Sequence, residues 1–525
     1  MPGNLTQIVE LLLLLLIAAS LVAMAARRFR VPYTIALVFA GVAIDLFHLP
    51  IVELLGESGA GERWLSPEII FMVFLPGLLF EAGININVRH LLKELGPILL
   101  VAVAGLLIAA AVTGYFVHWF VGIPLMAALV FGALISATDP ISVLALFKQL
   151  GVNKRLAVLV EGESLFNDGT AVVLFQILVA AVATGEFSVA AGVGRFFVVS
   201  LGGAAIGLGL GYVVSRVTQR VDDPQVEITL TTILAYGSFL MAEHFHLSGV
   251  IAVVAAGLMI GNFGAEVGMS SRTKVAVWSF WEYVGFVINS LVFLLIGIEV
   301  HVLSLMQYWQ PILLAILAVL VGRALAVYPL APLAGLMGAS IPTKWRHVMF
   351  WGGIHGGVSL ALALSLAPDF PNRELILAMT FGVVAFSIVV QGLSVTPVMR
   401  WLGVKLGDED EYDRTRVRQM ALAAASAELA GMHKAHVVSV PVYDRLRSEL
   451  DQGQQEMERR VEQLHAEDES WVEEEERLAR ARLLGAEKTA IQRALRDGLI
   501  SHHTAEEMAA RADEEMERLG GVGPH

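Results

Sequence analysis

Cysteine is missing from this sequence, and charged residues are scarce. None of the 525 residues is cysteine, so disulfide bonds are excluded and the sequence gives no redox clue to a compartment. Charged residues make up only 16% of the chain, whereas 56% of it is hydrophobic and the mean hydropathy is +0.68. An ordinary soluble domain does not reach these values. The composition therefore indicates a membrane protein with several spans.

Motifs of nucleotide-using and metal-using enzymes are missing as well. The sequence has no glycine-rich phosphate-binding loop and no adenine-nucleotide motif, which gives no support to coupling with ATP hydrolysis. No histidines or cysteines have zinc-like spacing, and no nucleophile–base pair is visible. We therefore expect no cofactor, no nucleic-acid partner and no enzymatic activity.

Thirteen apolar segments have the length of membrane spans when the chain is read with a window of about 20 residues. The first has no basic residue before it and three arginines behind it, which is the reverse of a secretory signal peptide. We expect spans near residues 5–26, 32–49, 67–85, 95–121, 124–148, 154–184, 192–217, 226–244, 247–264, 275–301, 308–337, 346–367 and 374–402. The sequence thus predicts an all-α polytopic membrane protein.

Basic residues between these spans lie almost entirely on one side. The segments on one side carry sixteen lysines and arginines, and those on the other carry only Arg63, Arg195 and Arg373. Such an excess is typical of cytoplasmic loops. We expect a multi-pass protein of the cell membrane, embedded in the lipid bilayer, with its N-terminus outside and its C-terminal tail in the cytoplasm.

The acidity of the chain is confined to its C-terminal part. The net charge is −13, and residues from 405 onward hold 27 acidic and 17 basic residues, against 22 and 19 before them. The pattern there is helical, with interruptions expected at Gly453, Gly485 and Gly498. We predict a transmembrane domain over residues 1–404 and a helical, acidic, cytoplasmic regulatory tail over residues 405–525. A dedicated partner-binding module is the alternative for the tail.

Two pairs of segments suggest an internal repeat. VFLPGLLFE (Val73–Glu81) resembles VFLLIGIE (Val292–Glu299), and two other spans about 215 residues apart are interrupted, by SATDPIS (Ser136–Ser142) and GGIHGGVS (Gly352–Ser359). Because seven spans separate the members of each pair, the second copy would be inverted in the membrane. Paired broken helices in inverted halves are typical of secondary transporters. Chance similarity among Leu-, Phe- and Gly-rich helices is the alternative for the first pair.

Polar residues inside the sixth span mark a candidate site, because an ionisable group at this depth is costly. In the stretch ESLFNDGTAVV, Ser164 and Asp168 lie on one face of a helix, and Glu163 and Asn167 lie on an adjacent stripe. A hydroxyl and a carboxylate one turn apart are oxygen ligands of the kind that hard cations prefer. An ion pair with a structural role is the alternative for Asp168.

The fifth span is expected to break at Thr138, Asp139 and Pro140. Proline removes a hydrogen-bond donor and pushes the preceding residue out of the helix. The break frees main-chain carbonyl groups and presents the Asp139 carboxylate, for which helix capping is the alternative. Glu81 in the third span is either a ligand through water, a proton stop or a structural residue.

Arg323 is the only basic residue well inside a span. Because a buried charge needs a partner, we expect Arg323 to pair with Glu163. This structural ion pair leaves Asp168 free to bind a cation.

The segment SATDPISVLALFKQLGVNKRLAVLVEGESLFNDGTAVVLF (Ser136–Phe175) resembles the core of the monovalent cation:proton antiporters of the first family. That family includes bacterial sodium/proton antiporters and animal sodium/proton exchangers. The matching pieces are TDP in the fifth span and GESLFNDG in the sixth, and the likeness extends over about residues 1–404. It implies 13 transmembrane helices with inverted repeats and two crossing broken helices, and a homodimer.

The resemblance also implies roles for single residues. Asp168 would carry cation and proton in turn, Asn167 would steady the broken span, and Glu163 would pair with Arg323. With Glu81 added from its position in the third span, the residues expected to bind the cation or proton are Asp168, Asp139, Thr138, Ser164, Asn167 and Glu81. The direct ligands of the transported cation would be Asp168, Asp139, Thr138 and Ser164.

His355 departs from the family pattern, in which the twelfth span usually has arginine. The break there needs a positive charge near the carbonyl ends of the half-helices, and histidine is only partly charged at neutral pH. Three readings follow: another base compensates, His355 gives transport a pH dependence, or His355 is a neutral packing residue.

The function expected from these features is secondary antiport of Na⁺ or Li⁺ against H⁺. Because Asn167 cannot ionise, a single mid-membrane carboxylate predicts electroneutral exchange. A K⁺/H⁺ antiporter shares the same motif, and the sequence does not separate the two. A passive cation channel belongs to a different class, and the ring of carbonyl groups from repeated subunits that it would need is absent from the sequence pattern.

Overall fold

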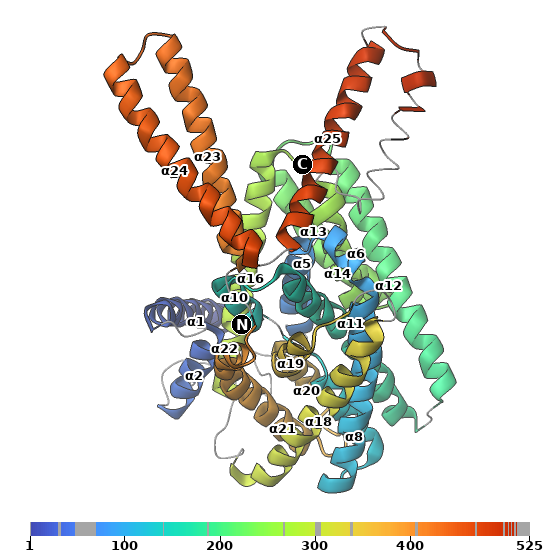
Figure 1. The fold of residues 1–525 in the computed structure, drawn as a ribbon. Coiled ribbons are helices and arrows are strands. Elements are labelled where there is room, and N and C mark those ends of the chain that lie inside the picture. Colours follow the sequence, from blue (N-terminus) through green and yellow to red (C-terminus); the bar gives the residue numbers. More distant parts are fainter. Residues whose placement is uncertain are drawn as a thin grey trace. The chain divides into compact units, whose positions relative to one another are not determined.

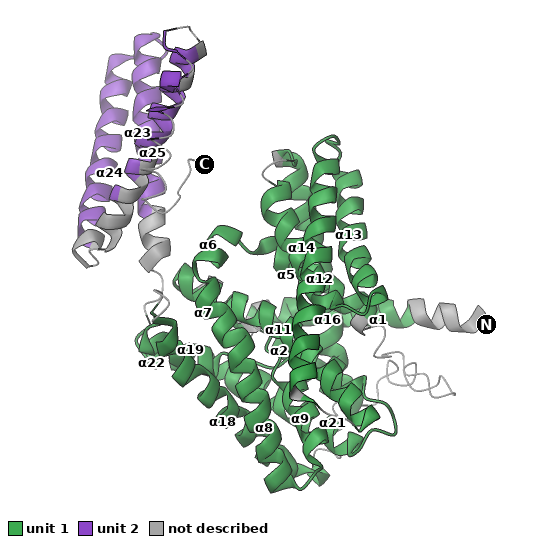
Figure 2. Cartoon of the chain, turned by 90° about the vertical axis from the view of Figure 1, so that its right-hand side faces the viewer, with its two compact units in different colours: residues 1–406 green, residues 407–525 purple. Residues whose placement is uncertain are grey.

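In the computed structural model, the described residues form helices joined by short connections, without strands (Figure 1). The structure describes residues 2–29, 33–47, 70–139, 141–185, 188–265, 268–299, 306–335, 340–404, 408–467, 470–496, 499–501, 503–505, 507–508 and 511. The chain divides into two compact units, Met1–Leu406 and Gly407–His525 (Figure 2).

In the first unit, the described residues form α-helices and four short π-helical stretches. They are α1 (Pro2–Phe29), α2 (Tyr33–Leu46), η1 (Ile70–Phe74), α5 (Leu75–Asn85), α6 (Val88–Lys93), α7 (Leu95–Leu99), η2 (Leu100–Gly105), α8 (Leu106–Val121), α9 (Leu125–Ile135), α10 (Ile141–Leu150), α11 (Lys154–Thr184), α12 (Val189–Thr218), α13 (Pro224–His244), α14 (Gly249–Met259), η3 (Ile260–Gly264), α16 (Ser271–Glu299), α18 (Trp309–Ala334), α19 (Thr343–Trp351), α20 (Gly357–Leu364), α21 (Arg373–Phe386), η5 (Ser387–Gln391) and α22 (Gly392–Trp401).

Each of the thirteen predicted spans coincides with one helix or with consecutive helical segments. Among the described residues, six helices are long and apolar enough to cross a membrane, and five apolar helices are shorter. The long ones are Leu95–Val121, Lys154–Thr184, Ala190–Thr218, Arg272–Ile298, Trp309–Ala334 and Arg373–Trp401. The all-α membrane class is thereby confirmed, and the count of thirteen crossings stays a prediction.

The helices of the first unit pack in two groups. The α16 group consists of α2, α5, α12, α13, α14 and α16, and the α11 group consists of α8, α9, α11, α18, α20 and α21. The groups meet where α11 packs against α5, α12 and α14, and where α20 packs against α16. The helix that carries the predicted site therefore lies at the boundary between the groups.

Helix α11 is set by signals at both of its ends. The side chain of Asn153 accepts a hydrogen bond from the main-chain N–H of Arg155 at 2.9 Å, which caps the first turn. Gly185 follows the last turn with a φ of 70°, a conformation that glycine adopts without steric cost. The 31 residues between them form one unbroken helix, which fixes the spacing of its polar side chains.

Two pairs of glycines allow close helix contacts within the α16 group. A Cβ atom added to Gly41 of α2 would lie 2.7 Å from the Cα of Gly297 in α16, and one added to Gly83 of α5 would lie 3.3 Å from the Cα of Gly257 in α14. Gly41 and Gly257 are about 215 residues apart, and so are Gly83 and Gly297. The two contacts are thus equivalent under the offset of the predicted repeat. This agreement supports a repeat over chance similarity.

Both predicted helix interruptions are present. The first break lies between α9 and α10, and the second lies between α19 and α20. The two breaks cross, because the main-chain N–H of Asp139 donates to the carbonyl oxygen of Ile354 at 2.6 Å. Pro140, which we expected to cause the first break, lies outside the described residues.

The long helices that the structure describes in the second unit are α23 (Asp408–Lys434), α24 (Val440–Glu467) and α25 (Ser470–Arg496). The expected interruptions at Gly453 and Gly485 are wrong, because both glycines lie inside helices. A helical glycine costs only about 1 kcal/mol relative to alanine, and Gly453 lies against Leu422 of α23. The chain turns instead after α23, where His436 has a φ of 58°. Gly498 lies outside the described residues.

Candidate functional site

A cavity of about 260 Å³ lies between the two helix groups. Its lining includes residues of α5 and α16 on one side and of α11, α20 and the first break on the other. Five of the six residues predicted to bind the cation or proton line it: Glu81, Thr138, Asp139, Ser164 and Asp168. The structure therefore brings residues from three separate spans to one cavity.

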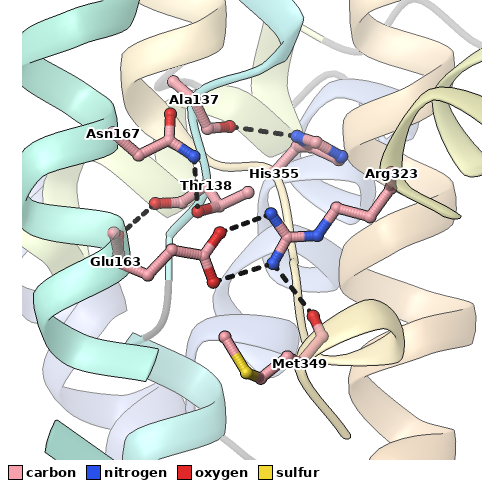
Figure 3. Close-up of polar contacts among 8 residues, drawn as sticks. Ala137, Thr138, Glu163, Asn167, Arg323, Met349 and His355 are labelled. Carbon is pink, nitrogen blue, oxygen red and sulfur yellow. Dashed lines mark hydrogen bonds and ion pairs between the residues drawn. The ribbon is translucent and has the colours of Figure 1, made fainter. Parts of the chain in front are cut away.

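The first break is tied to α11 by two hydrogen bonds to Thr138. The hydroxyl of Ser164 donates to the carbonyl oxygen of Thr138. Nδ2 of Asn167 donates to Oγ1 of Thr138 at 3.3 Å (Figure 3). Because Ser164 uses its proton in this bond, its oxygen keeps lone pairs that can face a cation. Asn167, the sixth predicted residue, holds the break in place and does not line the cavity.

Asp168 has the side chain best suited to bind a cation or a proton. It lines the cavity, and its Oδ1 is buried with no hydrogen-bond partner in the described part of the chain. A buried oxygen of this kind is costly unless something binds it. Asp139 lies nearby at the crossing, where a Cβ atom on Gly356 would overlap its carboxylate. Only a glycine at position 356 lets the second break come this close.

Glu163 and Arg323 form a buried ion pair with two contacts. Nη1 of Arg323 donates to Oε1 of Glu163 at 2.5 Å, and Nη2 donates to Oε2 at 3.1 Å (Figure 3). The side chain of Arg323 is 11% exposed and that of Glu163 is 3% exposed. Glu163 thus points away from the cavity and toward α18, which separates its contacts from those of Asp168 on the same helix.

Arg323 also serves the second break. Its Nη2 donates to the carbonyl oxygen of Met349 at 2.9 Å, in the last turn of α19 (Figure 3). A positive charge is favourable at the carbonyl end of a helix. A Cβ atom on Gly353 would lie 2.5 Å from Nε of Arg323, so the glycine makes room for the guanidinium. The base that could compensate for the missing arginine at position 355 is therefore present.

His355 is buried at the crossing of the two breaks, with 4% of its surface exposed. Its Nδ1 lies 3.0 Å from the carbonyl oxygen of Ala137, which also accepts a hydrogen bond from the hydroxyl of Ser359 at 3.2 Å. A carbonyl only accepts, so Nδ1 carries a proton, which neutral imidazole can provide. With Asn167 and Arg323, His355 lines a separate small pocket and not the cavity.

Comparison with other proteins identifies the family. The family described as sodium/hydrogen exchanger, transmembrane, matches residues 12–401. The chain belongs to this family. It is 39% identical over 514 residues to the Na⁺/H⁺ antiporter NhaG of Bacillus atrophaeus, and the aligned region covers 96% of each chain. It is 41% identical over 405 residues to the Na⁺/H⁺ antiporter NhaH of Halobacillus dabanensis, and the aligned region covers 75% of this chain and 98% of NhaH.

The fold also matches a solved structure of a related transporter. The sodium proton antiporter MjNhaP1 from Methanocaldococcus jannaschii superposes with a TM-score of 0.64 at 20% sequence identity, over 76% of this chain and 99% of that chain. This similarity shows the same fold. The family resemblance and the fold class expected from the sequence are thus confirmed, and the chain is a multi-pass membrane protein of a transporter family.

Three polar residues of the cavity were missed in the sequence. Glu161 of α11 lies seven residues before Asp168, a spacing that places both on one helix face. Its nearness to the end of the predicted span concealed it. Asn85 of α5 and Asn289 of α16 carry no charge and gave no signal. The helical spacing within this exchanger chain could have found Glu161.

Proposed function

We propose that this protein is a secondary antiporter that exchanges Na⁺ for H⁺ at Asp168. The observation that carries the proposal is the unpartnered, buried oxygen of Asp168 on a cavity between two helix groups. Ser164, Thr138 and Asp139 add the hydroxyl and carboxylate oxygens that hard cations prefer. The names and identities of NhaG and NhaH support Na⁺ as the cation. Li⁺ fits the same ligands, and K⁺ is the competing cation.

Exchange follows from competition at one carboxylate. Asp168 holds either a proton or a cation, and an empty, charged carboxylate is costly to carry through a low-dielectric barrier. Only the loaded forms then cross, so alternating access couples the two fluxes. Asn167 cannot ionise, and Asp139 stays charged as a ligand. One Na⁺ therefore moves against one H⁺, and the cycle carries no net charge.

A second and much smaller pocket at the crossing of the two breaks argues against a passive channel. The pocket lined by Asn167, Arg323 and His355 has a volume of about 10 Å³. That is about the space that one water molecule needs. A cation in the cavity would need a rearrangement of the helix groups to leave on that side, which is what an alternating-access transporter does.

The arrangement in the membrane and the tail form part of the proposal. The excess of basic residues on one side supports an external N-terminus and a cytoplasmic tail. We propose a homodimer, and a regulatory role for the second unit. In support, the antiporter NhaH aligns over 98% of its own length with only 75% of this chain. A chain that ends at Val404 should keep cation-driven proton flux in proteoliposomes with a changed pH set-point. Complete loss of flux in correctly inserted protein would contradict this.

The transport assay tests the proposed function directly. The purified full-length protein is placed in proteoliposomes that contain a pH-sensitive dye, and a gradient of Na⁺, Li⁺ or K⁺ chloride is imposed. We expect Na⁺ and Li⁺ to drive proton flux and Asp168→Asn to abolish it. A flux driven better by K⁺ would change the substrate, and activity retained in Asp168→Asn would remove Asp168 from the mechanism.

A further inference from the structure

Glu161 shares its helix face and its cavity with Asp168. Glu161, Ser164 and Asp168 recur at three- and four-residue steps along α11, and all three line the cavity. Seven residues of helix separate the two carboxylates by about 10 Å along the axis. Glu161 lies toward the end of α11 that begins at Lys154, which is the end we predict to be cytoplasmic. The cavity thus has an acid at two depths.

A second acid stands on the opposite wall of the cavity. Glu81 of α5 lines the same cavity. Asn85 donates a hydrogen bond to Oε1 of Glu81 at 2.8 Å, which orients the carboxylate. Because α5 belongs to the α16 group and α11 to the other group, the two acids lie on opposite sides of the boundary that must move during transport.

Glu161 differs from Glu163 and Glu94 in having no hydrogen-bond or ion-pair partner among the residues that the structure describes. Glu163 is paired with Arg323 at 2.5 Å, and Glu94 of the α6–α7 turn is paired with Arg155 at 2.6 Å. In the described residues, no side chain or main-chain group hydrogen-bonds to the Glu161 carboxylate, which is half-buried against the cavity. Among the described residues that line the cavity there is no lysine, arginine or histidine, and the only side-chain hydrogen bond to either glutamate comes from Asn85 to Glu81. The two acids therefore have no positive charge beside them in the cavity that would offset their repulsion.

We propose that Glu161 is a cation-binding residue of the transport path. Together with Glu81 it holds Na⁺ in the part of the cavity nearer the predicted cytoplasmic end of α11, before the ion reaches Asp168. Carboxylate oxygens and the carbonyl oxygen of a nearby amide side chain are suitable ligands for such an ion. This inference rests on the proposed function, since it places the residue on the route of the exchanged cation. The cation between Glu81 and Glu161 also offsets the repulsion between the two helix groups.

The first test compares cation affinity on the two sides of the membrane. Glu161→Gln is reconstituted in full-length protein, and Na⁺ is added to vesicles of known orientation. Glu161→Gln removes one of the two negative charges near the proposed ion. When Na⁺ is added on the side of Lys154, the apparent KM for Na⁺ should therefore rise roughly fivefold or more. The KM from the other side should change by less than about twofold, as should the maximal rate. Glu10→Gln, which removes an exposed acid of α1 outside the cavity, is the matched control and should leave both KM values unchanged.

The second test asks whether the two acids act on the same ion. Glu81→Gln, Glu161→Gln and the double variant form a cycle, and effects on one shared ion should not add. Glu161→Asp keeps the charge and should restore most of the affinity, which also excludes a folding defect as the cause.

The outcomes separate this inference from the function on which it rests. A wild-type protein without Na⁺-driven proton flux would defeat the proposed function. Wild-type exchange combined with an unchanged KM in Glu161→Gln, an equal shift from both sides, or equal effects of Gln and Asp at position 161 would overturn the role of Glu161 alone.

Discussion

The two broken helices have similar architecture and different chemistry. The first break, between α9 and α10, presents Thr138 and Asp139 to the cavity. The second break, between α19 and α20, consists mainly of glycines and His355, and the positive charge beside it comes from Arg323 of another helix. The first break therefore supplies oxygen ligands for a cation. The glycines of the second break leave room for its neighbours, and Arg323 supplies the positive charge beside it.

This difference shows how a repeat can diverge without losing its fold. The glycine contacts Gly41–Gly297 and Gly83–Gly257 keep the equivalent positions of the repeat packed in the same way. The polar residues at the two breaks have no such equivalence, because only one of them needs to hold a cation. Packing residues thus preserve the symmetry of the fold, while the chemistry is concentrated in one half.

The largest expected effect comes from removing Arg323. Arg323→Ala strands the buried Glu163 carboxylate and leaves the carbonyl of Met349 without its donor. We expect a loss of about 3–5 kcal/mol of stability, seen as a large fall in the melting temperature of the purified protein. Exchanging the two residues, Glu163→Arg with Arg323→Glu, should restore part of it.

The matched control for Arg323 is the more exposed pair of Arg155 and Glu94. The Arg155 side chain is 35% exposed, so Arg155→Ala should cost less, about 1 kcal/mol. Arg323→Ala could instead melt at the wild-type temperature and change only the affinity for Na⁺. The arginine would then belong to the cation path, which would contradict its assignment as the charge that stabilises the second break.

A smaller effect is expected where the second break touches the first. Gly356→Ala places a Cβ atom against the carboxylate of Asp139 and should displace it from the cavity. Misplacing one ligand should reduce Na⁺/H⁺ exchange by about tenfold or more, measured as initial proton flux at low Na⁺. The control is Gly194→Ala on α12, where a Cβ atom meets nothing within 4 Å, and it should leave the initial proton flux unchanged. Equal activity of the two variants would show that the contact is unimportant.

The smallest effect is expected at His355. His355→Gln keeps a side-chain donor near the carbonyl of Ala137, so the loss should be about 1 kcal/mol of stability at most. Because Arg323 already supplies the positive charge at this break, we expect the dependence of the exchange rate on pH to keep its midpoint. A clear displacement of the acid side of that profile would assign pH modulation to His355, as one reading of the sequence suggested.

Much of the fold and of the candidate site could be predicted because the membrane makes polar residues informative. Apolar length located the helices, and carboxylates and hydroxyls inside them pointed to Asp168, Ser164 and the first break. The contact between Glu163 and Arg323 followed from the scarcity of buried bases. Helical spacing also separated the stripe of Ser164 and Asp168 from that of Glu163 and Asn167, and the structure gives the two stripes different neighbours.

The rest depends on contacts between distant segments. The bond from Arg323 to Met349 and the hydrogen bond from Asp139 to Ile354 arise only when the two breaks cross. Asn289 of α16 lines the cavity without any charge to mark it. Gly453 of the second unit shows the opposite error, in which a weak local preference was taken as a break and the packing of α23 on α24 outweighed it.

The central claim is that one titrating carboxylate, Asp168, sets a one-for-one exchange while Asp139 of the first break stays charged. Exchange measured in proteoliposomes under an imposed membrane potential tests it most directly, with Na⁺ and proton gradients held equal in size. We predict that neither the rate nor the equilibrium of Na⁺/H⁺ exchange changes between an inside-negative and an inside-positive potential. A shift of either with voltage would mean that the cycle moves net charge, and that a second group besides Asp168 releases a proton.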